Sequence, residues 1–161
     1  KLSILSIFLP LLLAPSRCAA RFRNPTSPRA FVGAHNEVRA FLGEPPLVWS
    51  PILAAYARNY ANQSAGDCAM KHSGGPYGEN LASGSWDLTA KEAVGLWLEE
   101  KVGFLTNPKA CMDSGECLHY TQVVWRSTKA VGCGRAKCAD GWTFVVCSYD
   151  PPGNFVGELP Y

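Results

Sequence analysis

The chain lacks the short signatures that mark the common hydrolase and metal sites. HExxH, the zinc-peptidase signature, is absent, and so is GxSxG, which carries a serine nucleophile on a sharp turn. There is no pair of CxxC motifs and only three histidines are present, so a zinc–thiolate site is not favoured. Lysine and arginine are scattered rather than grouped, which argues against a nucleic-acid partner.

The N-terminal residues have the pattern of a secretory signal. Lys1 is followed by the apolar run LSILSIFLPLLLA and then by small residues suited to cleavage. The run is too short to span a membrane, and Pro10 interrupts it. The alternative is a buried N-terminal helix. We expect residues 1–20 to be a signal peptide, residues 21–29 a polar N-terminal arm, and residues 30–161 the folded domain of a secreted, extracellular protein.

The cysteine count agrees with secretion. The chain has seven cysteines, but Cys18 lies in the expected signal peptide, so six remain. An even set in a secreted chain predicts three disulfides, with 15 possible connectivities, and leaves no thiol to act as a nucleophile. Removal of Lys1 and Arg17 also lowers the basic count from 15 to 13, equal to the 13 acidic residues. The mature protein is therefore expected to be near neutral.

Three segments have helical signals. Apolar residues recur with a helical period from Ala30 to Leu42, where Gly43 follows. A second helix is predicted after Ser50 as N-cap, with Pro51 at its first position. A third is predicted after a capping box in TAKE, and it buries Val94 with Trp97 or Leu98. The buried face of the second helix is expected to hold Leu53, Tyr56, Ala57 and Tyr60.

The C-terminal half is rich in strand-forming residues. HYTQVVW, AVGCGRAKC and WTFVVCSYD are separated by turn residues, which predicts an antiparallel meander with His119 at the start of its first strand. Helical segments followed by strands indicate an α+β fold in which helices cover a sheet.

The stretch HSGGPYGENL places His72 and Glu79 on either side of a glycine-rich turn. Its glycines allow positive φ and close approach of the backbone. A phosphate-binding loop would need a helix N-terminus after the glycines, whereas the strand-like ENLA follows. A second imidazole is available at His119 and a second carboxylate in WLEE, so the turn is half of a wider polar site.

Taken together, these segments resemble the CAP superfamily, named for cysteine-rich secretory proteins, antigen 5 and pathogenesis-related class-1 proteins. AHNEVRA, GDC, HSGGPYGENLA, HYTQVVW, GCGRAKC and CSYDPPGNFVG are similar to its successive blocks, in the same order, from about Phe31 to Tyr161. The resemblance implies an α-β-α sandwich with a central antiparallel sheet. The chain is most similar to the plant class-1 branch, which implies a non-enzymatic, antimicrobial defence protein of the apoplast.

The resemblance implies a cavity tetrad of His72, Glu79, Glu100 and His119. In related proteins the two histidines hold a divalent ion, and imidazole with carboxylate suits zinc. The alternative is a tetrad that only hydrogen-bonds across the fold. No required cofactor and no catalytic residue follow from either interpretation. The alternative function is a metal-dependent hydrolase that uses the tetrad.

Further expectations come from the same resemblance. The implied disulfides are Cys68–Cys138, Cys111–Cys117 and Cys133–Cys147. Relatives bind sterols through the segment after Glu100, which implies lipid contacts at Val102, Phe104 and Leu105, although an apolar loop is more often core. The expected partners are sterols or lipids of pathogen membranes, and we expect a monomer. Asn62 lies in the one glycosylation sequon that lacks proline.

The last residues, 151–161, follow the final cysteine after a short spacer. The prolines and glycines of PPGNFVG disfavour a helix or a central strand, so side-chain contacts of Phe155 and Val156 are expected to hold the segment. In plant relatives the corresponding segment is released as a defence-signalling peptide. That implies cleavage between Asp150 and Pro151 and a receptor for the peptide. The alternative is a terminal segment that simply packs on the sheet.

Overall fold

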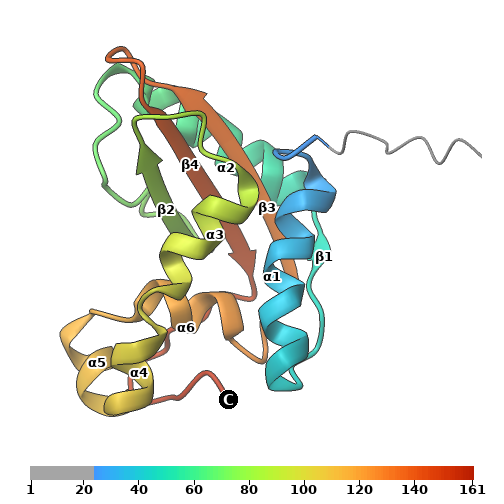
Figure 1. Ribbon diagram of the computed structural model, residues 1–161, viewed down its shortest axis with the longest axis vertical. Helices are drawn as coiled ribbons and strands as arrows, with labels where there is room; N and C mark the ends of the chain where they lie inside the picture. The colour runs from blue at the N-terminus through green and yellow to red at the C-terminus, as the bar shows by residue number, and fades with distance from the viewer. Residues whose placement is uncertain (1–23) are drawn as a thin grey trace, which may run out of the picture.

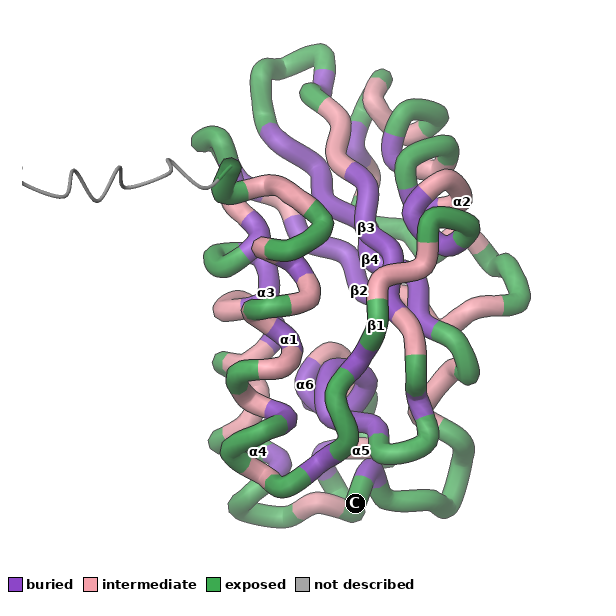
Figure 2. Tube along the Cα trace, turned by 90° about the vertical axis from the view of Figure 1, so that its right-hand side faces the viewer, coloured by how far each residue is buried: buried purple, intermediate pink, exposed green. Residues whose placement is uncertain are grey.

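The computed structural model of the protein describes residues 24–161. The predicted signal peptide over residues 1–20 lies outside the described residues, as does the start of the predicted arm. In the described part, a four-stranded sheet lies between one helix, α2 (Pro51–Gln63), and a pair of helices, α1 (Pro28–Leu42) and α3 (Ala90–Leu98) (Figures 1 and 2). This is the α-β-α sandwich that the resemblance implies.

The first helix begins earlier than predicted. The side chain of Ser27 accepts a hydrogen bond from the Ala30 backbone at 3.2 Å, and Pro28 occupies the first helical position. The predicted arm over residues 21–29 is therefore too long, because Pro28 and Arg29 are helical. The helix ends as predicted at Gly43, whose φ of +74° is left-handed.

The second helix starts as predicted at Ser50 and Pro51, but its buried face differs. The fully buried residues are Leu53, Ala54, Ala57 and Ala61. The cause lies in β3, where Cβ atoms at Gly132 and Gly134 would overlap the backbone of α2. Because the helix approaches the sheet so closely, alanine occupies three of these four buried positions. The two predicted tyrosines lie at the margin, where Tyr56 donates to Ser73 Oγ and Tyr60 to the Lys71 carbonyl.

The sheet has the order β1-β3-β4-β2. Its strands are β1 (Val48–Trp49), β2 (Gly78–Gly84), β3 (Ala130–Lys137) and β4 (Thr143–Asp150). The predicted hairpin of β3 and β4 is present, and β2 pairs antiparallel with β4. The short β1 was not predicted and runs parallel to β3, so one edge departs from an antiparallel sheet.

The predicted strand HYTQVVW is wrong, because these residues form the helix α6 (Leu118–Val124). Tyr120 to Val124 are all buried. A segment that is buried all round shows no helical spacing of apolar and polar residues, so its sequence does not distinguish a short helix from a strand. His119 consequently lies in the first turn of a helix and not at the start of a strand.

Three short helices gather with the C-terminal residues at one end of the molecule (Figure 1). They are α4 (Lys101–Thr106), α5 (Pro108–Ser114) and α6, and a short 3₁₀ turn (Ser64–Gly66) follows α2. The structure contains the three disulfides implied by the resemblance: Cys68–Cys138, Cys111–Cys117 and Cys133–Cys147. None of the helices in residues 24–161 combines the length and the hydropathy needed to cross a membrane.

Candidate functional site

His72 and Glu79 form one half of the candidate site. Glu79 lies in β2, and its Oε1 accepts hydrogen bonds from His72 Nδ1 at 2.9 Å and from the Ser73 backbone at 2.8 Å. The Glu79 side chain is only 6% exposed, whereas that of His72 is 61% exposed. The second carboxylate oxygen, Glu79 Oε2, is buried and has no protein partner. This orphaned oxygen is available to water, a cation or another donor.

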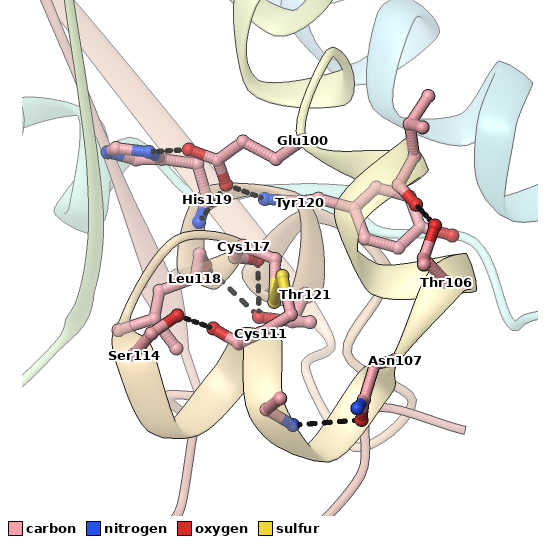
Figure 3. The surroundings of a disulfide bond; sticks show 12 residues. Glu100, Thr106, Asn107, Cys111, Ser114, Cys117, Leu118, His119, Tyr120 and Thr121 are labelled. Carbon is pink, nitrogen blue, oxygen red and sulfur yellow. Dashed lines mark hydrogen bonds and ion pairs between the residues drawn. A yellow bond between two sulfur atoms is a disulfide. The ribbon is translucent and has the colours of Figure 1, made fainter.

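Glu100 and His119 form the other half (Figure 3). Glu100 Oε1 accepts from His119 Nδ1 at 2.6 Å, while its Oε2 accepts from the backbone N–H groups of His119 at 2.9 Å and Tyr120 at 3.1 Å. The carboxylate thus fixes both the ring of His119 and the first turn of α6. From β2, Asn80 donates to the His119 carbonyl at 3.0 Å. The sequence analysis missed Asn80, whose only signal is its position next to Glu79.

The contact between His72 and Glu79 shifts the pKa of both side chains. The hydrogen bond that His72 donates to Glu79 raises the pKa of His72, although partial burial opposes this. Burial is the strongest single influence on Glu79 and raises its pKa, but hydrogen bonds from His72 and Ser73 together outweigh it and leave that pKa lowered. Glu79 is therefore an anion at neutral pH inside a polar cavity.

Each histidine of the site has one ring nitrogen left for a divalent ion. Both histidines use Nδ1 for a carboxylate, which leaves Nε2 as the ring atom that would face a metal, an orientation common among zinc-binding histidines. Within residues 24–161, however, no three His, Cys, Asp or Glu side chains come together as a set that could hold a metal ion. Two imidazole nitrogens fall short of the three or four protein ligands of a firmly held zinc ion.

A polar cavity of about 260 Å³ lies beside the first pair. Its wall includes His72 and Glu79, the glycine turn, Gln122 of α6 and residues 152–154. Gly78 is required here, because a Cβ atom at this position would overlap Gln122 and crowd the Pro152 backbone. The glycine-rich turn between His72 and Glu79 therefore lines a cavity, and residues 152–154 complete its wall.

A larger groove of about 640 Å³ lies between α5 and the C-terminal residues. It is lined by Lys109, Met112, Asp113, Leu118 and residues 154–159. Of the three residues expected to contact lipid, Val102 and Leu105 are 74% and 61% exposed, but Phe104 is only 4% exposed. The Phe104 ring packs against the rings of Tyr120 and Tyr161. Phe104 thus belongs to the core, the interpretation that the sequence left open.

Two further predicted sites lie at the surface. Asn62 is exposed in the last turn of α2. Asp150 and Pro151 are exposed at the end of β4. Of the two predicted anchors of residues 151–161, Val156 is wrong because it is fully exposed, whereas Phe155 is half exposed and packs edge-on against the ring of Trp125. Hydrogen bonds to α6, mainly through Gly153 and Asn154, also hold these residues.

Comparisons with known proteins agree with this geometry. The profile of the cysteine-rich secretory protein (CAP) family matches residues 32–149. The chain belongs to the CAP family. It is 50% identical to the basic form of pathogenesis-related protein 1 of Nicotiana tabacum over 135 residues, which cover 84% of this chain and 76% of that one. It is 49% identical to pathogenesis-related protein 1 of Arabidopsis thaliana, with coverage of 84% and 83%.

Solved CAP structures have the same fold. The structure of BmVAL-1 superposes with a TM-score of 0.73 at 25% identity and covers 89% of this chain and 85% of that one. NaASP2, whose structure was solved with Zn²⁺, superposes with a TM-score of 0.69 at 25% identity, covering 86% of this chain and 88% of that one. The fold and the family are therefore established by independent comparisons.

Proposed function

We propose that this CAP protein is a secreted plant defence protein without enzymatic activity. The observation that carries the proposal is the identity of about half the residues to proteins named pathogenesis-related protein 1 over most of the chain. Three disulfides suit the oxidising extracellular space, where small secreted domains depend on such bonds. Its place of action is the apoplast.

Its antimicrobial target is the sterol or lipid of a pathogen membrane. The groove between α5 and residues 154–159 supports this choice, because its volume of about 640 Å³ is in the range of small-ligand pockets. Its apolar lining includes Met112, Leu118 and Leu159, and Lys109 lies at its rim. The exposed side chains of Val102 and Leu105 on α4 supply further apolar surface.

Sterol binding is tested with a pair of surface variants. Leu159 lines the groove and is 56% exposed, so Leu159→Asp places a charge in the groove without disturbing the core. Ile52→Asp is the matched control, since Ile52 is 73% exposed on α2 and does not line the groove. Binding of ergosterol to the purified protein should fall at least about tenfold in the first variant and stay unchanged in the second, since burying an unpaired charge is costly. Undetectable binding by the wild type removes the lipid mechanism.

The protein is also the precursor of a C-terminal signalling peptide. Beyond the peptide bond to Asp150, residues 151–161 have no covalent link to the other described residues, because none of the three disulfides includes them. Hydrogen bonds nevertheless fix both residues of the predicted cleavage site. Lys129 N–H donates to the Asp150 carbonyl, and Thr128 Oγ1 donates to the Pro151 carbonyl. Cleavage between Asp150 and Pro151 therefore requires local opening of this end of β4.

Peptide release is tested by peptidomics of extracellular fluid from wounded or infected tissue. The fragment from Pro151 to Tyr161 should accumulate with the truncated protein, and a receptor on the plant cell would then bind it. Detection of the intact protein without this fragment would contradict the precursor role and leave the sterol experiment unaffected.

The alternative of a metal-dependent hydrolase is kept because His119 and Glu100 are close enough to transfer a proton. The protein requires no cofactor in our proposal, and zinc binds only weakly through His72 and His119. Calorimetry with zinc at neutral pH should show weak binding that is lost in His119→Gln. Peptide hydrolysis that a chelator abolishes and that His119→Gln eliminates would favour the hydrolase instead.

A further inference from the structure

The C-terminal segment, residues 151–161, is fastened to the part of the chain that carries His119. Every hydrogen bond between this segment and the remaining described residues, apart from the ladder contact at Asp150, ends on α6 or on residues 125–128. Gly153 N–H donates to Gln122 Oε1 at 2.9 Å, and Arg126 N–H donates to the Pro160 carbonyl at 2.9 Å. The segment therefore runs along α6 and is held at both of its ends.

Asn154 makes the central contacts of this arrangement. Its Nδ2 donates to the Leu118 carbonyl at 2.8 Å, and its Oδ1 accepts from Thr121 Oγ1 at 2.6 Å. Its φ of +61° is left-handed, a conformation that asparagine adopts more readily than most residues. One side chain thus joins two positions of α6 from a backbone conformation that few other residues accept.

The contacts of the segment flank His119 on both sides. Leu118 is bonded to Asn154, and the hydroxyl of Tyr120 lies 2.9 Å from that of Tyr161. His119 itself is fixed by Glu100 and by Asn80. The first turn of α6 therefore makes hydrogen bonds with Glu100 and Asn80 and also with the C-terminal segment.

The segment also forms part of the wall of both the polar cavity and the larger groove. Residues 152–154 line the cavity beside His72 and Glu79, and residues 154–159 line the groove beside α5. Asn154 is common to the two sets. Removal of this segment would therefore take away part of the wall of both the cavity and the groove.

We propose that Asn154 is a positioning residue: it fastens the C-terminal segment to α6 and thereby sets His119 against Glu100 and closes the walls of both the cavity and the groove. Detachment of the segment then loosens the His119 half of the site and opens the groove in the same event. Whether the segment ever detaches in the plant rests on the peptide release proposed above. Once the peptide is released, neither the cavity nor the groove keeps a complete wall. The contacts themselves do not depend on that release.

Histidine resonances offer a direct readout, because the chain contains only three histidines, His35, His72 and His119. His35 is fully buried against Phe31 and Tyr149, so it reports on the core. His72 reports on the cavity and His119 on α6. With labelled histidine, NMR spectra at one fixed pH follow all three sites in the purified, uncleaved protein.

The variants form a graded series. Asn154→Asp keeps the acceptor for Thr121 but removes the donor to the Leu118 carbonyl, while Asn154→Gly removes both and keeps the left-handed backbone accessible. Val156→Ala is the matched control on the same segment, since Val156 is fully exposed. We expect both Asn154 variants to shift the His119 and His72 signals and leave His35 in place. Amide exchange in α6 should quicken about fivefold per lost hydrogen bond.

Unshifted His119 and His72 signals in Asn154→Gly, with rapid exchange of the Gly153 amide, would overturn the proposal, because α6 would then keep its position without the segment. If the Asn154 variants also move His35, Tyr161→Phe decides, since it removes only the hydroxyl that meets Tyr120. In that variant a shift of His119 alone supports the proposal, and an unshifted His119 rejects it. A failure to find the released peptide in tissue would not change the interpretation of these NMR and exchange experiments.

Discussion

His35 and Arg39 lie in the core on the inner face of α1, and each has at least one hydrogen-bond partner on a distant segment of the chain. The guanidinium of Arg39 donates only to backbone carbonyls, and these belong to Pro45, Val123, Trp125 and Thr128. His35 Nδ1 lies 2.8 Å from the Phe31 carbonyl and Nε2 lies 2.8 Å from the Tyr149 hydroxyl. Because a carbonyl only accepts, Nδ1 carries the proton in the neutral ring. Such contacts stabilise a buried polar group that would otherwise be costly.

This environment makes His35 a source of acid sensitivity. Burial lowers the pKa of His35 to about 4, so the ring is neutral when folded, whereas the unfolded chain takes up a proton near pH 6.5. Stability from this residue is complete above about pH 6.5 and falls by about 3 kcal/mol as the pH drops to about 4. Urea unfolding of the wild type and of His35→Gln between pH 7 and pH 4 checks this. Equal pH dependence in the two proteins would contradict it.

At the scale of elements, two glycines of β3 decide how closely α2 approaches the sheet. Gly132 faces the backbone of Leu53 and Ala54, and Gly134 faces that of Ala57 and Arg58. No side chain at either position could move away, since the obstacle is helix backbone. Gly95 in α3 contrasts with them, because a Cβ atom there would meet nothing within 4 Å.

Alanine substitution should therefore act in opposite directions at the two kinds of glycine. Gly134→Ala should lower the free energy of unfolding by about 3 kcal/mol, because α2 must shift away from β3. Gly95→Ala, in the interior of α3, should raise the free energy of unfolding by up to about 1 kcal/mol, because alanine has the higher helix propensity. Urea unfolding at pH 7 measures both. A destabilised Gly95→Ala, or an unchanged Gly134→Ala, would show that the packing differs from that described.

At the scale of the whole molecule, the disulfides join segments with very different separations. Cys68 and Cys138 are 70 residues apart, whereas Cys111 and Cys117 are six apart. The first links the end of the α2 region to the end of β3, and the second ties α5 to α6 beside Glu100 and His119 (Figure 3). A bond across a longer loop restricts the unfolded chain more strongly.

Removal of each bond should reflect this difference. The double variant Cys68→Ser with Cys138→Ser should lose about 4 kcal/mol of unfolding free energy, and Cys111→Ser with Cys117→Ser about 2 kcal/mol. Denaturant unfolding of both variants gives the comparison. A larger loss from the short loop would indicate that the α5–α6 end contributes native contacts beyond chain entropy. Any loss of the His119 signal in that variant would localise those contacts.

The C-terminal segment shows the limit of reasoning from local sequence. Its prolines and glycines correctly excluded a helix and a strand. They did not identify what holds it, because the partners of Gly153 and Asn154 lie more than thirty residues away on α6. The prediction of Phe155 and Val156 as anchors rested on their hydrophobicity alone: Phe155 does pack against Trp125, but Val156 is fully exposed.

The sequence by itself determined the local features of this protein. Ser50 with Pro51, and Thr89 with Glu92, set the starts of two helices because caps act within a single turn. The order of short blocks along the chain was enough to indicate the family, and with it the three disulfides. The hairpin of β3 and β4 also followed from composition.

Other features depend on the contacts that a residue makes in the folded protein, and these became known only from the tertiary structure. HYTQVVW became a helix because packing on all sides removed the periodicity that would have marked it. The four residues of the predicted tetrad resolved into two His–Glu pairs, since each carboxylate is also bound by nearby backbone N–H groups. Phe104 entered the core because the rings of Tyr120 and Tyr161 meet it there. Contacts between distant segments form only in the folded chain, and no local pattern encodes them.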